Sequence, residues 1–95
     1  MSKFVFLFHG QSEVTDEVSA AWHEWFESIG PHIVDSGNPF GAGREVTAGT
    51  GVDLTAAMAP ASGYTIVSAD SLDAAEKLLV GCPSSVARVY EAMPM

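Results

Sequence analysis

The chain is poor in basic residues. Only four of its 95 residues are Lys or Arg, against twelve that are Asp or Glu, which gives a formal net charge of −8. The four are scattered at Lys3, Arg44, Lys77 and Arg88. Binding to a nucleic-acid backbone or an anionic membrane surface requires clustered positive charge. We therefore expect no nucleic-acid partner and no membrane partner, and the acidity is typical of a small domain kept soluble by its charge.

Disulfides, membrane spans and metal motifs are also lacking. The only cysteine, Cys82, has no partner in the chain, which favours a reducing cytoplasmic location. No apolar run approaches the ~18 residues of a membrane span, and the run Phe4–Phe8 is too short for a signal peptide and lacks a cleavage site. A metal site needs three or four converging ligands. The sequence offers only the pair His23 and Glu27, so we predict no metal and no cofactor.

The first strand is predicted over Lys3–His9 and is apolar on both faces. Phe4, Phe6 and Phe8 alternate with Val5 and Leu7, and strand side chains change face at every residue. A strand with one wet face would alternate with polar residues instead. The pattern therefore predicts that both faces of this sheet are covered.

A helix is predicted from about Asp16 to Ile29, with Thr15 as its N-cap and acidic residues in its first turn. Its apolar residues recur at helical spacing, which indicates a face that packs on a core. They are Val18, Ala21, Trp22, Trp25, Phe26 and Ile29. Gly30-Pro31 ends the helix, and a turn over 35–39 follows the short apolar segment 33–34.

The middle of the chain, residues 37–63, is rich in glycine and poor in large apolar residues. We predict a loose strand near Arg44–Thr47, a turn, and a mobile loop over Val52–Ser62. A loop of this length is either a functional lid or a disordered connection, and the sequence leaves both interpretations open.

The last third reads as strand, helix and strand. Residues 63–69 are predicted as a strand, Asp70 as the cap of a helix with Asp73 in a capping box, and 86–93 as a final strand after Pro83. The apolar stripe of this helix is predicted from Leu72, Ala75, Leu78 and Leu79. Together the segments predict one α+β domain over residues 1–95.

Several segments, in this order, resemble the YCII-related family, also called the DGPF domain family. They cover residues 4–10, 33–39, 63–69, 70–76, 82–83 and 90–95. The Asp-Gly-Pro-Phe motif itself is absent, and Gly37-Asn38-Pro39-Phe40 stands as an echo of it.

The resemblance implies a ferredoxin-like βαββαβ fold with an antiparallel sheet, which dimerises sheet against sheet as a dimeric α+β barrel. The apolar faces of the first strand point to the same homodimer, because two helices cover only one face of a sheet. The family is mostly of unknown function, although a few relatives act on small aromatic compounds with a His and Asp pair. Here His23 is the imidazole nearest to that helical position, and Asp35 lies in the corresponding turn.

The candidate catalytic residues are thus His9, His23 and Asp35. Imidazole is the side chain most easily used as a general base near neutral pH. His9 ends the first strand, at the predicted rim of a pocket, whereas His32 lies in a turn expected to be solvated.

Two functional classes follow. The first is a small enzyme or ligand-binding protein whose aromatic cavity is formed by Phe4, Phe6 or Phe8 with Trp22 and Tyr90, and guided by His9. The second is a non-catalytic partner or regulatory subunit that binds through its middle loop. A ligand that stabilises the protein would separate them.

Overall fold

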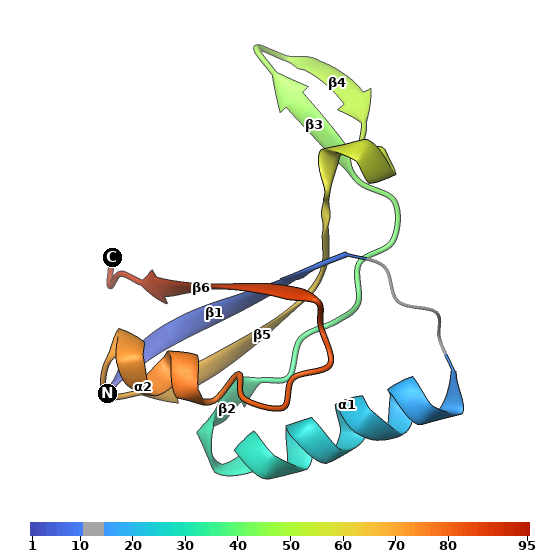
Figure 1. Ribbon diagram of the computed structural model, residues 1–95. Helices are drawn as coiled ribbons and strands as arrows, with labels where there is room; N and C mark the ends of the chain where they lie inside the picture. Colours follow the sequence, from blue (N-terminus) through green and yellow to red (C-terminus); the bar gives the residue numbers. More distant parts are fainter. Residues whose placement is uncertain (11–14) are drawn as a thin grey trace.

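A four-stranded antiparallel sheet organises the molecule, with strand order β2-β5-β1-β6. The computed structural model describes residues 1–10 and 15–95. Two α-helices pack on one face of the sheet, and a separate two-stranded hairpin projects away from it (Figure 1). In chain order the elements are β1 (Ser2–His9), α1 (Asp16–Ile29), η1 (Gly30–His32), β2 (Ile33–Asp35), β3 (Arg44–Thr47), β4 (Thr50–Asp53), η2 (Ala56–Met58), β5 (Ala61–Ala69), α2 (Leu72–Lys77) and β6 (Val86–Ala92).

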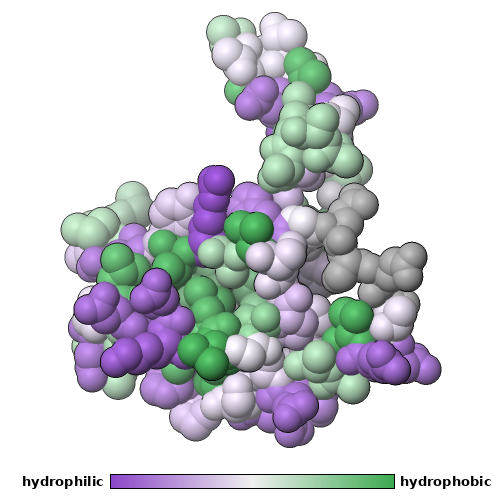
Figure 2. Space-filling model, in the orientation of Figure 1, coloured by the Kyte–Doolittle hydropathy of each residue, from purple (hydrophilic) through white to green (hydrophobic). Residues whose placement is uncertain are grey.

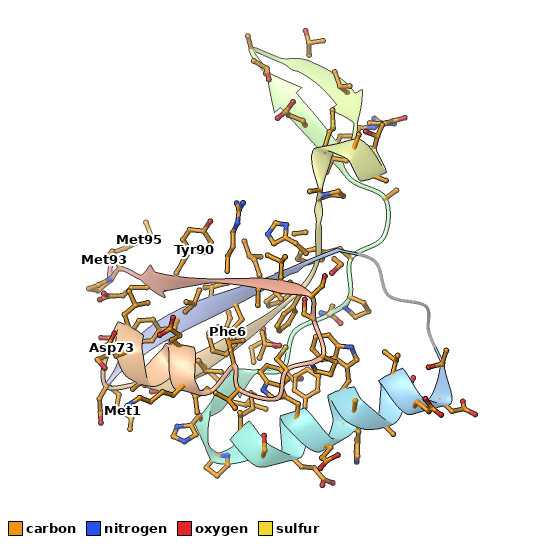
Figure 3. The ribbon with its side chains drawn as sticks, in the orientation of Figure 1. Met1, Phe6, Asp73, Tyr90, Met93 and Met95 are labelled. Carbon is orange, nitrogen blue, oxygen red and sulfur yellow. The ribbon has the colours of Figure 1, made fainter. Side chains whose placement is uncertain are left out.

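Strand β1 lies between β5 and β6 and supplies the centre of the core. Phe4, Phe6 and Phe8 are almost fully buried against the helices, as their alternation predicted. Val5 and Leu7 lie on the opposite face and are only half-buried. Figure 3 shows Phe6 pointing toward the helices, whereas Tyr90 of β6, paired with Val5, points away from them. The helices therefore cover one face of the sheet alone.

Helix α1 has the predicted bounds and the predicted cap. The Oγ1 atom of Thr15 accepts a hydrogen bond from the Val18 amide at 3.1 Å. Trp25 is 2% exposed, which confirms that it belongs to the core, and its indole Nε1 donates to the Leu78 carbonyl at 2.8 Å. This hydrogen bond ties α1 to the end of α2.

Helix α2 corrects two predictions. Its N-cap is Ser71 and not Asp70, because the Ser71 Oγ atom accepts from the Ala74 amide at 3.1 Å. Leu72, predicted on the apolar stripe, is 51% exposed. With Ser71 as cap, Leu72 becomes the first helical residue and points off the sheet. Ala75, fully buried, instead anchors the helix to the core.

The predicted loop over Val52–Ser62 is also corrected. Strand β4 pairs with β3 in a hairpin from Arg44 opposite Asp53 to Thr47 opposite Thr50, a short 3-10 helix follows, and β5 begins at Ala61. Ala48 and Gly49 have φ of 49° and 83° and form a two-residue turn with both residues left-handed, as a type I′ turn requires. The strand Arg44–Thr47 and the turn after it are confirmed, whereas β4 was missed, because the usual hairpin signal, Asn-Gly or Asp-Gly, is absent at this turn.

The hairpin extends the molecule. The radius of gyration is 14.4 Å, compared with about 12 Å for a compact domain of this length. Figure 2 shows hydrophobic residues over the middle of the body and a mixture of hydrophilic and hydrophobic residues on the hairpin. Across residues 1–10 and 15–95, the helices are too short and too polar to cross a membrane.

Candidate functional site

A groove opens at one end of the sheet, between α1, the start of β5 and the segment 36–40. Its volume is about 840 Å³. Its lining contains five aromatic side chains, and we call it the aromatic groove. The lining residues are Phe8, Gly10, Ser19, Trp22, Phe26, Ser36, Gly37, Asn38, Pro39, Phe40, Ser62, Gly63 and Tyr64.

The outer wall of the aromatic groove is a turn held by Asp35. One carboxylate oxygen of Asp35 accepts from the Gly37 amide at 2.9 Å, and the other accepts from the Tyr64 hydroxyl at 3.1 Å. Gly37 has a φ of 81°, and a Cβ atom there would lie 1.6 Å from the Tyr64 carbonyl oxygen. Only glycine lets the backbone pass so close to β5 in this conformation. The wall thus depends on an acidic residue that receives two hydrogen bonds and on a glycine beside it.

The same wall continues along the edge of β5. Pro39 forms an isolated bridge with Gly63, and the Phe40 amide donates to the Ser62 carbonyl at 2.8 Å. The Phe40 ring then stacks on the Tyr64 ring, with centroids 5.7 Å apart and an interplanar angle of 22°. Phe40 is 45% exposed, so its ring lies at the mouth of the groove and not in the core.

The inner wall is formed by side chains from β1 and α1. The Phe8 and Trp22 rings meet edge to face at 5.0 Å, and Trp22 and Phe26 lie 5.9 Å apart with planes tilted by 32°. Edge-to-face and offset arrangements are the favoured geometries of aromatic pairs. One turn further along α1, the buried Trp25 supports this wall from behind, with its ring 5.8 Å from Phe8.

The polar groups of the groove are uncharged. The Ser19 and Ser36 hydroxyls, the Asn38 amide and the indole Nε1 of Trp22 form no hydrogen bond with the described residues, whereas Ser62 Oγ donates to the Phe8 carbonyl. Within the described part of the chain, no Asp, Glu, Lys, Arg or His lines the groove. The groove therefore offers flat apolar surface and neutral hydrogen-bonding groups.

His9 lies outside this lining. Its Nδ1 atom is 3.0 Å from the Ala59 carbonyl oxygen, which accepts a hydrogen bond from the ring N–H. Its Nε2 atom is buried and has no hydrogen-bond partner among the described residues. His9 thus links the end of β1 to the base of the hairpin, and the polar groups of the groove are Ser, Asn and Trp side chains instead of this imidazole.

The other two candidate catalytic residues also lie apart. His23 is on the solvent side of α1, where its Nε2 atom is 3.2 Å from Glu27 Oε1, and both side chains are more than two-thirds exposed. Asp35 is engaged with Gly37 and Tyr64. In residues 1–10 and 15–95, no hydrogen bond or salt bridge joins any two of His9, His23 and Asp35. The structure therefore does not assemble a His and Asp pair from them.

Further groups do not add a reactive centre. Burial raises the pKa of the Cys82 thiol, an effect that a hydrogen bond with the Ser84 backbone opposes. Because the thiolate is the nucleophilic form, a raised pKa makes this cysteine less reactive at neutral pH. Among the described residues, no cluster of three or more His, Cys, Asp or Glu side chains is placed to hold a metal ion.

The sequence identified only part of the groove. Phe8 and Trp22 were predicted to line a cavity and do so, but Phe4 and Phe6 are buried in the core and Tyr90 lies on the opposite sheet face. Phe26, Phe40 and Tyr64 were missed as lining residues. The available signal was Phe40, a lone large aromatic residue in a stretch otherwise rich in glycine.

Comparison with known proteins adds no relative. The chain matches no protein-family model, no curated protein and no solved structure. The function is therefore argued from the groove itself.

Proposed function

We propose that this protein binds a small, flat, ring-containing molecule in the aromatic groove. The observation that carries the proposal is that two aromatic clusters, Phe8–Trp22–Phe26 and Phe40–Tyr64, line one groove at the end of the sheet. Binding sites are typically concave, mostly apolar and provided with a few polar groups that orient the ligand. No reaction is assigned, because no general base lines the groove in the described part of the chain.

The fold supports the same proposal. We infer that the order β2-β5-β1-β6 is that of a ferredoxin-like βαββαβ unit into which the β3–β4 hairpin is inserted. We interpret the molecule in this way, as the resemblance to YCII-related proteins implies. In that interpretation, the aromatic groove lies where the inserted segment leaves and rejoins the sheet.

A homodimer is part of the proposal. The sheet face opposite the helices carries Val5, Leu7, Ile66 and Tyr90, which are half-buried or exposed in the single chain. A second copy that packs its own sheet on this face would cover these side chains with a self-complementary interface. Sedimentation equilibrium at micromolar concentration should give twice the mass of one chain. A mass equal to one chain would end this part of the proposal without touching the groove.

The binding experiment uses thermal unfolding with 2-naphthol as the flat probe. A probe at one hundred times its Kd should stabilise the protein by about 2.7 kcal/mol through mass action. Phe40→Ala should remove most of the rise in unfolding temperature that 2-naphthol causes, because it deletes one aromatic wall without opening the core. Met58→Ala is the matched control, since Met58 is 46% exposed, close to the 45% of Phe40, and lies outside the groove.

The alternative function, a partner or regulatory subunit, has its own observation. Every residue of β3 and β4 is exposed, including Val46 at 65% and Val52 at 51%. These two apolar side chains lie on opposite faces of the projecting hairpin, Val46 opposite Gly51 and Val52 opposite Glu45, and each is accessible to a protein partner. If no flat ring compound shifts the unfolding temperature while the protein is folded, the groove proposal fails and this alternative is favoured.

A further inference from the structure

We propose that the ligand of the aromatic groove is uncharged, and that it carries a hydroxyl, carbonyl or amide group which the neutral side chains of the groove recognise. This inference rests on the proposed function and specifies the chemical class of its ligand. It is argued from the charges and the free hydrogen-bonding groups around the groove.

The charges of the groove and of the whole chain disfavour an anionic ligand. No cationic side chain lines the groove in the described residues, and the chain as a whole has a net charge of −8. A carboxylate or phosphate entering the groove would lose water without gaining a counter-charge, which is costly in an apolar site.

For a cationic ligand, the described lining of the groove offers no carboxylate as a counter-charge. Asp35, which lies next to the lining residue Ser36, already accepts hydrogen bonds from Gly37 and Tyr64 and does not line the groove. Aromatic faces alone attract a cation by only about 0.5–2 kcal/mol. They offer a neutral ring the same surface without the cost of removing the hydration of a charge.

Neutral polar groups are instead available on both walls. Trp22 on α1 has an indole N–H that donates to no described residue, whereas Trp25, three residues later, donates to the Leu78 carbonyl. Asn38, whose backbone lies along β5 beside Tyr64, has an amide with both donors and an acceptor, also without a described partner. A ligand in the groove that carries a hydroxyl, carbonyl or amide group thus finds an unused donor on Trp22 and unused donors and an acceptor on Asn38.

The test compares three probes of one ring size by isothermal titration at pH 7. They are 2-naphthol, which is neutral, 2-naphthoate, which is an anion, and 2-naphthylmethylammonium, which is a cation. We expect 2-naphthol to bind at least tenfold more tightly than either charged probe. Equal or tighter binding of the anion or the cation overturns the charge inference and leaves the proposed function intact. Binding of none of the three overturns both.

Two variants test the hydrogen bonds. Trp22→Phe keeps an aromatic ring but removes the N–H donor, and Asn38→Leu keeps the side-chain size but removes the amide. Each variant should bind 2-naphthol at least fivefold more weakly than the unchanged protein does. Its affinity for naphthalene, which has no polar group, should stay within twofold. Equal weakening of both probes by each variant would show that shape alone is recognised and would overturn the assignment of a polar ligand group. Circular dichroism of each variant verifies that it is folded.

Discussion

The sheet with its helices and the β3–β4 hairpin are held by different forces. In the first region, Phe4, Phe6, Thr65 and Val67 are less than 2% exposed, and they come from strands that are far apart in the sequence. In the second region, residues 44–47 and 50–53 are all exposed. A two-stranded hairpin alone is marginally stable in water. The comparison shows that non-local burial stabilises the body, while local cross-strand pairing, the exposed Arg44–Asp53 ion pair and turn geometry shape the hairpin.

The aromatic groove lies at the boundary between these two regions. Its inner wall, Phe8 and Trp22, belongs to the packed body, and its outer wall, residues 36–40, leads to the hairpin. Core packing positions the inner wall, whereas hydrogen bonds of the turn at Asp35 and of segment 38–40 with β5 position the outer wall. The following predictions test how far the difference between the two regions extends.

The largest effect is expected for Trp25→Ala. This change removes a large buried ring and the hydrogen bond to the Leu78 carbonyl, so the free energy of unfolding should fall by about 3–5 kcal/mol. Val46→Ala in the hairpin should change it by less than about 0.5 kcal/mol. Urea titration measures both. A loss below about 1 kcal/mol for Trp25→Ala would place the ring outside the stabilising core.

The next effect compares two glycines with almost the same φ, Gly37 at 81° and Gly49 at 83°. An added Cβ meets the Tyr64 carbonyl oxygen at Gly37 and nothing within 4 Å at Gly49. Gly49→Ala should therefore cost about 1 kcal/mol of left-handed strain, which weakens the hairpin locally and changes the free energy of global unfolding by less than about 0.5 kcal/mol. Gly37→Ala should cost about 2–3 kcal/mol in the same titration, because it also forces the wall of the groove away from β5. Equal costs for the two variants would refute the close approach at Gly37.

The difference between the regions also explains what the sequence could reveal. The alternation of Phe4–Phe8 and the spacing from Val18 to Ile29 predicted strand and helix, because each pattern records which side chains face a core. The hairpin buries nothing and so leaves no such pattern. The groove was half visible for the same reason: Phe8 and Trp22 lie on core-facing stripes, whereas Phe40 and Tyr64 meet only through the turn at Gly37.

Helix α2 was predicted correctly, but its N-cap was not. The sequence contains two adjacent capping residues, Asp70 and Ser71, and only three-dimensional geometry selects Ser71. Ser71→Ala should lower the free energy of unfolding by about 1 kcal/mol, because the Ala74 amide loses its acceptor. Asp70→Ala should change it by less than about 0.5 kcal/mol. The reverse ranking in thermal or urea unfolding would restore Asp70 as the cap.

The smallest effect concerns two alanines that share a φ of 49°, Ala48 at the hairpin turn and Ala59 at the hairpin base. Asparagine tolerates this left-handed conformation better than alanine, so each Ala→Asn change should relieve about 0.5 kcal/mol of strain. The Ala59 carbonyl accepts from His9 of β1, which couples this residue to the body. Ala59→Asn should therefore raise the free energy of global unfolding. Ala48→Asn should leave global unfolding unchanged and slow amide hydrogen exchange only within 44–53, because opening of the hairpin does not require the core to unfold.

If Ala48→Asn instead raised the global stability as much as Ala59→Asn, the hairpin would unfold together with the sheet, and the division of the molecule into two regions would be wrong.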